Sequence, residues 1–491
     1  MKHAKKLASL LLALVMVFAL ATTAFATGTN SITVKNAVKD QEYKLYKMLD
    51  LVVNDAHTAY SYTVNSAWKN FFKAAEGETP AGKGLTYVNI DAQGYVTWKE
   101  NADVAAFAKD AEEFAKDLTA LKTHTASADG DFAFSELEAG YYLVTSTLGT
   151  KATVGTTPGN PNPEIQEKNA APVNVKTVEE DSKVGKEGVD AWGSTNDADI
   201  GQTVNFKSTI TAQAGAENYV FHDKMSSGLT YGSVTGITLN GKTVDASNYT
   251  VTAPATDGDT FDVTFTQAFC DTLKANDQIV ISYTATVNEK AVIGGNGNEN
   301  SSKLSYGDST NTKTTPDSTT KTYTWSFDVL KYGNNDETKV LKDAKFVLMN
   351  KDKSKVATIV NGKFTGWVDV PAAGEDGSIT WPANTELTTD ANGKIEIKGL
   401  DADTYYLRET QAPAGYNKLA NDVEVKIEPT ESTDGKTLTL TAVTSKINNN
   451  AGTELPSTGG IGTTIFYVLG SVLVIGAAVL LVTKKRMGAA E

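Results

Sequence analysis

The sequence predicts a mainly β protein made of tandem immunoglobulin-like β-sandwich domains, with helical insertions in the N-terminal domain. Between about residues 170 and 450, short runs rich in Thr, Val and Tyr are separated by turn residues, a rhythm typical of sandwiches. The segment before residue 167 also holds one strongly helical pattern. The chain of 491 residues has a single cysteine, Cys270, so no intramolecular disulfide stabilises these domains.

Residues 1–26 have the features of a signal peptide. Three lysines within the first six residues precede an apolar core from Leu7 to Leu20, and Ala24-Phe25-Ala26 supplies the small residues of a cleavage site. We therefore expect an exported chain that begins at Thr27. Its length of roughly 430 residues corresponds to about three domains.

Residues 27–167 are predicted to form the N-terminal domain, which mixes helix and strand. An amphipathic helix is expected over 104–121, because apolar residues recur there at helical spacing with charged residues between them. A second helix is expected over 66–75, and strands over 31–34, 43–49 and 141–146. The Pro- and Asn-rich stretch 158–172 is the predicted junction with the next domain.

Two β-sandwich domains are predicted to follow, at 168–310 and 323–452. Both show strand-like runs of four to twelve residues bounded by turn signals. The polar Thr/Ser/Lys run 311–322 between them is interpreted as a connector.

The C-terminal residues 455–491 form a separate segment with a membrane-anchoring pattern. Leu455-Pro456-Ser457-Thr458-Gly459 precedes an uncharged apolar run from about Ile461 to Val482, which Lys484-Lys485-Arg486 follows. The apolar run is long enough to cross a bilayer as a helix, and the basic cluster is expected to stay on the cytoplasmic side.

Strand alternation predicts an unusual set of buried polar residues in the third domain. In the strand from Trp325 to Lys331, the lysine shares a face with the apolar residues. The same alternation places Glu409 with Leu407, and Asn449 with Ile447. An amine, an acid and a carboxamide are thus predicted inside one core, where each charge costs several kcal/mol to bury alone.

Buried together, these three groups have a chemistry that removes the cost. Desolvation lowers the pKa of an amine and raises that of a carboxylic acid, so both are neutral more readily. The neutral amine can then attack the carboxamide while the acid transfers protons, which releases ammonia and leaves an amide cross-link. No cofactor is required.

Composition argues against several other functions. The net charge is −14 and the exported part has no Lys/Arg-rich patch, which argues against nucleic acid as a partner. The four histidines lie singly, so no metal site of the zinc type is predicted. No nucleophile elbow supports a surface hydrolase. Cys270 is interpreted as a buried apolar residue.

The C-terminal pattern resembles the cell-wall sorting signal of Gram-positive surface proteins. That resemblance implies that a sortase cleaves between Thr458 and Gly459 and passes the threonyl carboxyl to an amine, so that membrane anchoring is transient. An ordinary single-pass anchor is the alternative. The stretch Tyr405 to Tyr416, YYLRETQAPAGY, resembles the E-box of Gram-positive pilins. In collagen-adhesin B-type domains of that kind, the matching residues imply a Lys331–Asn449 isopeptide bond with Glu409 as the catalytic acid.

The second domain resembles the preceding isopeptide-forming domain of the same pilins, through NYVFHDKMSSGLTY and GNENSSKLSY. By position, Asp223 is the implied acid and Asn300 the implied bonded asparagine. Lys176 fits the first-strand pattern best, although alternation places it opposite Val173 and Val175. Lys183 is the alternative amine.

The resemblance also implies an acceptor lysine for the sortase product. Pilin backbones offer it in a YPKN-type motif, which this chain lacks; its nearest counterpart is Gln166-Glu167-Lys168-Asn169. Lys168 is therefore the expected acceptor, with Lys183 and Lys186 as alternatives.

The resemblance as a whole implies a fimbrial backbone subunit on the cell wall, with sortase, neighbouring pilin subunits and peptidoglycan as partners. Such a subunit is not a turnover enzyme, since each isopeptide reaction happens once. The alternative is a monomeric wall-anchored adhesin, whose N-terminal domain would use aromatic residues to bind a ligand. The candidates for that role are Tyr60, Tyr62, Trp68 and Trp98.

Overall fold

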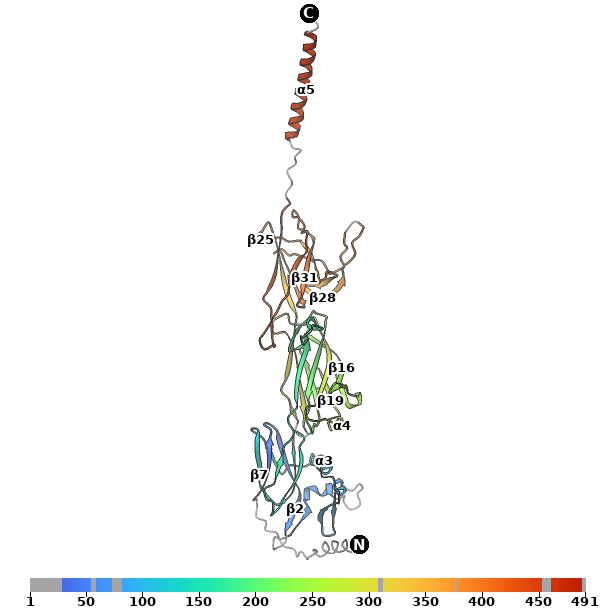
Figure 1. The fold of residues 1–491 in the computed structure, drawn as a ribbon, viewed down its shortest axis with the longest axis vertical. Helices are drawn as coiled ribbons and strands as arrows, with labels where there is room; N and C mark the ends of the chain where they lie inside the picture. The colour runs from blue at the N-terminus through green and yellow to red at the C-terminus, as the bar shows by residue number, and fades with distance from the viewer. Residues whose placement is uncertain are drawn as a thin grey trace. The chain divides into compact units, whose positions relative to one another are not determined.

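The computed structural model describes residues 29–53, 59–72, 82–307, 312–375, 378–452 and 461–487. The predicted signal peptide and the pentapeptide Leu455 to Gly459 lie outside these residues. Strands dominate the described chain, and helices are few (Figure 1). The chain divides into two compact units, residues 1–325 with 429–439 and residues 326–428 with 440–491, each of which is described by itself.

Two sheets form the N-terminal part of the first unit. One has the order β10-β1-β7; the other has the order β4-β5-β3-β2-β8-β9, with β6 also paired to β2. Their strands are β1 (Asn30–Ala37), β2 (Glu42–Val53), β3 (Tyr60–Val64), β4 (Val88–Ile90), β5 (Tyr95–Trp98), β6 (Lys122–Thr125), β7 (Gly130–Leu137), β8 (Gly140–Ser146), β9 (Lys151–Thr156) and β10 (Glu164–Gln166). Because β10 pairs with β1, part of the predicted 158–172 junction belongs to this sheet.

The predicted 66–75 helix is helical as far as residue 72, and its residues 73–75 lie outside the described residues. The helical elements of this part are η1 (Ser66–Trp68), α2 (Lys69–Phe72), η2 (Lys83–Thr86) and α3 (Val104–Ala115). The prediction that the long helix reaches residue 121 is wrong, because the backbone N–H of Leu121 donates to Leu45 O and draws the chain onto β2. Asp103 caps the start of α3 by accepting from two backbone N–H groups.

An aromatic core lies beneath α3. Phe71 is 2 % exposed and its ring contacts those of Trp68, Phe72, Phe107 and Phe114. Aromatic rings bury large apolar areas and gain further from edge-to-face packing, so this cluster stabilises the part of the chain that has no predicted cross-link.

The middle part of the first unit is a β-sandwich. Its two sheets have the orders β12-β11-β14-β20-β16-β17 and β13-β23-β21-β15-β19-β18, with β22 paired to β21. The elements are β11 (Val173–Glu179), η3 (Asp181–Lys183), β12 (Trp192–Gly193), β13 (Thr195–Asp197), β14 (Thr203–Thr211), β15 (Val220–Met225), β16 (Leu229–Leu239), β17 (Lys242–Thr243), η4 (Ala246–Asn248), β18 (Tyr249–Thr252), β19 (Phe261–Phe265), α4 (Gln267–Cys270), β20 (Gln278–Val287), β21 (Asn298–Tyr306), β22 (Lys313–Thr314) and β23 (Ser318–Tyr323).

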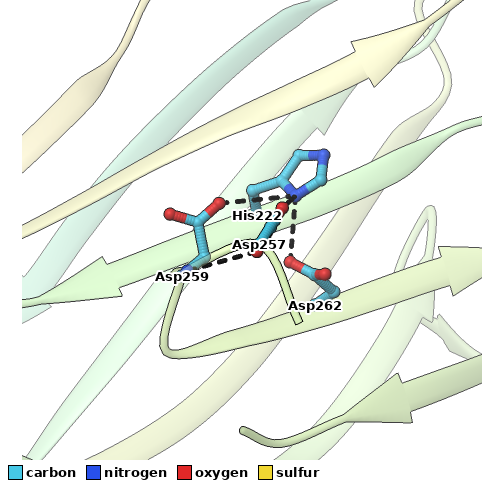
Figure 2. A group of neighbouring side chains, drawn as sticks. All are labelled: His222, Asp257, Asp259 and Asp262. Atoms are coloured by element: carbon cyan, nitrogen blue, oxygen red, sulfur yellow. Dashed lines mark hydrogen bonds and ion pairs between the residues drawn. The ribbon is translucent and has the colours of Figure 1, made fainter. Parts of the chain in front are cut away.

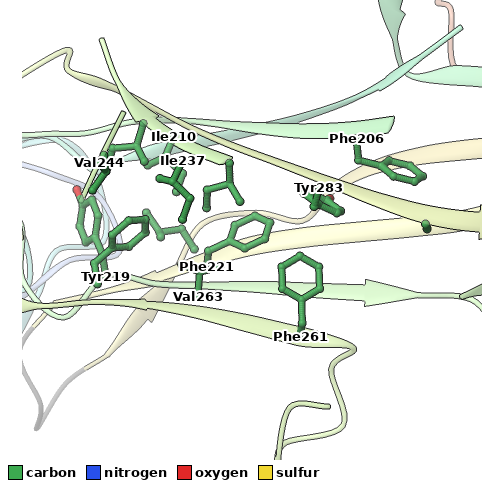
Figure 3. Close-up of a cluster of buried hydrophobic side chains, with 14 of the residues drawn as sticks. Phe206, Ile210, Tyr219, Phe221, Ile237, Val244, Phe261, Val263 and Tyr283 are labelled. Atoms are coloured by element: carbon green, nitrogen blue, oxygen red, sulfur yellow. The ribbon is translucent and has the colours of Figure 1, made fainter. Parts of the chain in front are cut away.

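The core of this middle sandwich fills the space between its sheets. Phe206, Ile210 and Tyr283 come from one sheet and Phe221 and Phe261 from the other, and all are buried (Figure 3). Cys270 is also buried here, and burial raises its thiol pKa to about 11, which agrees with a small apolar role.

The interpretation of 311–322 as a connector is wrong. Its second half is β23, which pairs antiparallel with β21 and parallel with β13 and so completes a sheet of the middle sandwich. Thr320 and Thr322 are buried at alternate positions. Threonine is a strong strand former despite its polarity, which is the signal that the polar composition obscured.

The second unit contains a sheet with the order β25-β24-β30-β28-β27-β26-β31-β32; in addition, β29 pairs with β26 and β35 with β24. The strands are β24 (Trp325–Gly333), β25 (Asp336–Val340), β26 (Lys345–Met349), β27 (Lys355–Val360), β28 (Lys363–Asp369), β29 (Leu387–Thr388), β30 (Lys394–Leu400), β31 (Thr404–Gln411), β32 (Val423–Lys426) and β35 (Val443–Asn449). We call this the C-terminal sandwich. The hairpin of β33 (Thr430–Glu431) and β34 (Leu438–Thr439) groups with the first unit.

Helix α5 (Ile461–Met487) ends the described chain. Its stretch Phe466–Lys485 has a mean hydropathy of 2.4 and no buried residues, so by length and composition it can cross a membrane. This agrees with the predicted apolar run.

Replacing Phe71 tests the aromatic core. Phe71→Ala is expected to lower the free energy of unfolding of the N-terminal sheets by about 3–5 kcal/mol, since it leaves a cavity among four other rings. Thermal unfolding followed by tryptophan fluorescence measures the change. Leu121→Ala, at a side chain that is 53 % exposed, is the control and should cost less than about 0.5 kcal/mol. Equal effects of the two changes would contradict the assignment of this core.

Candidate functional site: two buried clusters of amine, acid and carboxamide

The C-terminal sandwich buries Lys331 as alternation predicts. Trp325, Phe327, Val329 and Lys331 occupy successive inward positions of β24, and Lys331 is 0 % exposed. Strand β24 pairs in parallel with β35, with Lys331 opposite Ile447 and Gly333 opposite Asn449. This register lets the long lysine side chain reach the end of the last strand.

Three side chains meet around this amine. Lys331 Nζ donates to Asn449 Oδ1 at 2.5 Å and to the backbone oxygen of Ile447 at 3.2 Å. Asn449 Nδ2 donates to Glu409 Oε1 at 2.8 Å, and Glu409 Oε2 accepts from the backbone N–H of Leu419 at 2.7 Å. The acid therefore contacts the amide nitrogen that would leave, and the amine contacts the amide oxygen.

In the middle sandwich, Lys176 is buried on the face of β11 opposite to Val173 and Val175. Val173 and Val175 are each 50 % exposed, whereas Asn174, Lys176 and Val178 point inward. The expectation that the valines mark the core face is wrong, because the inner face of β11 carries polar and charged groups that meet partners on the facing sheet.

Lys176 lies against both residues that the pattern paired with it. Its Nζ donates to Asn300 Oδ1 at 2.7 Å and forms a short contact with Asp223 Oδ2. Asp223 and Asn300 are both 0 % exposed, on the neighbouring strands β15 and β21. The alternative amine, Lys183, is 38 % exposed and pairs with Glu431 at 3.8 Å, so it does not enter this cluster.

Burial controls the protonation of both clusters. Desolvation lowers the pKa of Lys176 to about 8, against the opposing effect of the Asp223 charge. Desolvation lowers the pKa of Lys331 to about 8 as well, against the opposing effect of the Glu409 charge. The pKa of the Asp223 carboxyl is raised by burial, which its contact with Lys176 partly offsets. Each amine is therefore closer to its nucleophilic neutral form than an exposed lysine.

The arrangement supports one reaction in each cluster. A neutral amine beside a carboxamide, with an acid at hand to transfer protons, can form an amide bond and release ammonia. Unpaired charges at such sites would cost several kcal/mol each, whereas the amide product is uncharged. The structure thus groups the six residues that the sequence pattern indicated into two clusters, three residues in each.

Lys168 lies at the surface between two residues, Glu167 and Asn169, whose side chains are held by hydrogen bonds. Glu167 is buried and accepts from Ser146 Oγ at 2.8 Å, and Asn169 Nδ2 donates to Leu148 O at 3.1 Å. The Lys168 side chain is exposed and makes no hydrogen bond or ion pair with any residue that the structure describes. Its backbone is thus held while its amine stays accessible.

A further cluster, which sequence spacing did not predict, surrounds His222 (Figure 2). Its Nδ1 lies 2.9 Å from Asp262, 3.5 Å from Asp257 and 3.6 Å from Asp259, and its Nε2 lies 2.8 Å from Ser305 Oγ. The donor atoms of the histidine and the three aspartates lie within 4.8 Å of one another, and such nitrogen and oxygen donors suit a divalent cation. The same carboxylates and Ser305 also serve as direct partners of the imidazole, so we assign no metal here. The signal in the sequence was the Asp257-Gly258-Asp259 run.

The aromatic residues of the N-terminal sheets divide into two groups. Trp68 is 1 % exposed and belongs to the core, whereas Tyr60 and Trp98 are 51 % and 41 % exposed. Tyr62 and Trp98 line a cavity of about 470 Å³ together with Tyr141.

Family models match three successive parts of the chain. Residues 200–310 match the Gram-positive pilin backbone subunit 2, Cna-B-like domain; residues 325–444 match a prealbumin-like fold domain. Residues 447–487 match the LPXTG cell wall anchor motif.

Two curated proteins are similar in sequence. A fimbrial subunit type 1 from Actinomyces viscosus is 37 % identical over 100 residues, which cover 20 % of this chain and 18 % of that protein. The trypsin-resistant surface T6 protein of Streptococcus pyogenes serotype M6 is 25 % identical over 57 % of this chain and 62 % of its own length. The matches thus span less than two thirds of either relative.

Solved structures show the same fold. The full-length major pilin SpaD of Corynebacterium diphtheriae superposes with a TM-score of 0.50 at 20 % identity, covering 86 % of this chain and 98 % of that one. The T6 backbone pilin of Streptococcus pyogenes serotype M6 gives 0.51 at 16 % identity, covering 89 % and 95 %.

The fold and the anchor motif define a class: proteins of tandem β-sandwiches that carry an LPXTG cell wall anchor motif. Within that class, the pilin backbone domain, the prealbumin-like domain and the LPXTG anchor motif make this chain similar to Gram-positive major pilins.

Replacing the acid of the C-terminal cluster tests its chemistry. Glu409→Ala is expected to abolish loss of one ammonia from the peptide pair that contains Lys331 and Asn449, as measured by mass spectrometry. It should also lower the free energy of unfolding by about 4–5 kcal/mol, because the cross-link would close a loop of 118 residues. Glu424→Ala, at an exposed glutamate of β32, is the matched control. Full cross-linking in Glu409→Ala would refute the role of the acid.

The lowered pKa values predict how cross-linking depends on pH. With a Lys331 pKa of about 8, protonation below that pH removes the nucleophile, so the rate should fall roughly tenfold per pH unit from 8 towards 6. The full chain, recovered unfolded from inclusion bodies before it has cross-linked, is diluted from urea into a mild detergent at each pH, and ammonia loss is followed by mass. A rate that keeps rising roughly tenfold per pH unit from pH 8 to pH 10, where an exposed lysine titrates, would contradict the lowered pKa.

Proposed function

We propose that this chain is the backbone subunit of a covalently polymerised fimbria, joined by a sortase and attached at its base to peptidoglycan. The observation that carries the proposal is the combination of two buried Lys-acid-Asn clusters with a cell wall anchor. An anchored adhesin needs the anchor but has no need of load-bearing cross-links in successive sandwiches.

The two clusters act as internal clamps. Lys176 and Asn300 form one isopeptide bond with Asp223 as the acid, and Lys331 and Asn449 form the other with Glu409. Support comes from the burial of all six side chains and from amine-to-carboxamide distances of 2.7 and 2.5 Å.

Sortase links successive subunits through Thr458 and Lys168. Cleavage between Thr458 and Gly459 forms an acyl-enzyme, and the Lys168 amine of the next subunit takes up the threonyl group. This choice is supported by the exposed side chain of Lys168 and by the hydrogen bonds of its neighbour Asn169, which fix the local backbone. Lys183 is engaged with Glu431, whereas Lys186 is exposed and stays the alternative.

The clamps set where a fibre under tension can extend. Tension would enter each subunit at Lys168 and leave at Thr458, so it crosses residues 176–300 and 331–449 through covalent bonds. The residues before 168 are outside this path. Residues 301–330 remain in it without a clamp. Among the described ones, β23 is held by its pairing with β21 and β13.

The acceptor prediction is tested on the cell surface. Cell-wall extracts from cells carrying the native chain should show a ladder of boiling-resistant multimers on a denaturing gel, and Lys168→Ala should collapse it to monomer. Lys186→Ala is the control, because this lysine is also exposed and is the remaining alternative. A ladder that survives Lys168→Ala moves the acceptor elsewhere, while monomer with the native chain favours the anchored adhesin.

A further inference from the structure

The acids of the two clusters make different contacts. In the C-terminal sandwich, Glu409 bonds directly to the carboxamide nitrogen of Asn449. In the middle sandwich no hydrogen bond joins Asp223 to Asn300, and both Asp223 Oδ1 and Asn300 Nδ2 are buried without a partner among the described residues. The middle acid therefore contacts the amine but has no direct route to the nitrogen that must leave.

Tyr283 contacts this acid and lies near the Asn300 side chain. It projects from the centre of β20, is 1 % exposed, and stacks on Phe206 with ring centroids 5.6 Å apart, beside Phe261 (Figure 3). Its hydroxyl donates to Asp223 Oδ2 at 2.6 Å, the same oxygen that contacts Lys176 Nζ. Packing against the neighbouring rings thus holds the Tyr283 hydroxyl on Asp223.

The phenol keeps its proton in this environment. Burial and the neighbouring Asp223 charge raise the pKa of Tyr283 well above its ordinary value, and the side chains of Ser208 and Asn300 lie close enough to act in the opposite direction. The Tyr283 ring also lies near the amine, with Lys176 Nζ 5.3 Å from its centroid. A neutral hydroxyl is therefore placed among acid, amine and carboxamide.

We propose that Tyr283 is a catalytic residue of the middle cross-link: it holds Asp223 on Lys176 and carries a proton from this acid to Asn300 Nδ2. The proposal rests on the proposed function, since it concerns the same amide-forming reaction. The C-terminal sandwich needs no such residue, because the backbone N–H of Leu419 holds Glu409 and the acid contacts the carboxamide directly.

The protons of the reaction balance along this route. The ammonium of Lys176 first gives one proton to the Asp223 carboxylate, and the free Nζ then forms a bond to Asn300 Cγ. Protonated Asp223 donates to the Tyr283 oxygen while the tyrosine proton passes to Nδ2, and Asp223 takes up the second proton that Nζ loses. The Cγ–Nδ2 bond breaks, ammonia leaves, and the carboxyl ends protonated with one hydrogen on the new amide.

Tyr283→Phe tests the proposal in the full chain. The substitution removes one hydroxyl and keeps the ring on Phe206. Each chain is recovered unfolded from inclusion bodies, before it has cross-linked, and is diluted from urea into a mild detergent. Mass spectrometry of digested samples then follows ammonia loss separately for the Lys176–Asn300 and Lys331–Asn449 peptide pairs. We expect the first to slow roughly tenfold or more and the second to keep its native rate.

Two comparisons separate a role of Tyr283 in the cross-linking reaction from a role in folding. Tyr306→Phe, at a tyrosine of the same sandwich that is 5 % exposed and hydrogen-bonds Gln41, should leave both rates unchanged. In a Lys176→Ala background, which cannot cross-link, adding Tyr283→Phe should cost only its one hydrogen bond to Asp223 and keep a cooperative thermal unfolding transition. The pH profile gives a further readout: native cross-linking should level off above the Lys176 pKa of about 8, whereas Tyr283→Phe should decline there, since the proton must then come from solvent.

Each result has a distinct meaning. Native-rate cross-linking of the middle sandwich in Tyr283→Phe overturns the inference and leaves the proposed function intact. Equal slowing of both cross-links, or an unchanged pH profile, also overturns it, because the hydroxyl would then serve folding alone. Absence of the Lys176–Asn300 bond from the native chain refutes the proposed middle cross-link itself and the role of Tyr283 with it.

Discussion

The burial of two lysine amines, Lys176 and Lys331, is the constraint on which the rest of the structure depends. An isolated ammonium in an apolar core costs several kcal/mol, so each lysine must have partners whose positions are fixed to within a hydrogen-bond length. Those partners come from strands far away in sequence, and holding them in register requires complete sandwiches. The same desolvation that makes the amines costly lowers their pKa and turns them into nucleophiles.

The two sandwiches meet this constraint with different parts. In the C-terminal sandwich, parallel pairing of β24 with β35 brings the first and last strands together, and Glu409 spans amide and backbone. In the middle sandwich, Lys176 and Asn300 lie on opposite sheets, and the Tyr283 hydroxyl donates to the acid where the C-terminal sandwich uses a backbone N–H. The same amide-forming reaction is therefore compatible with both arrangements, because it requires only that the amine, the carboxamide and the acid be buried and within hydrogen-bond distance.

The unbridged parts of the chain follow a different logic. The N-terminal sheets depend on aromatic packing around Phe71, with no comparable buried lysine among the described residues. Strand β23 adds ordinary ladder hydrogen bonds after the middle clamp. In the proposed fibre, covalent bonds carry tension where they exist, and backbone pairing carries it between Asn300 and Lys331.

The sequence alone determined the class of fold, the anchor and the burial of Lys331, Glu409 and Asn449, because a period of two sends alternate residues to one face whatever the surroundings. Local pattern failed where the inner face was itself polar. Exposed Val173 and Val175 made Lys176 appear to face outwards, and threonine-rich β23 resembled a connector. Only tertiary structure decided which face met the opposite sheet, and only it brought Tyr283 onto Asp223, since that contact joins strands 60 residues apart. Alternation is a property of one strand, whereas a reactive cluster is a property of several strands in register.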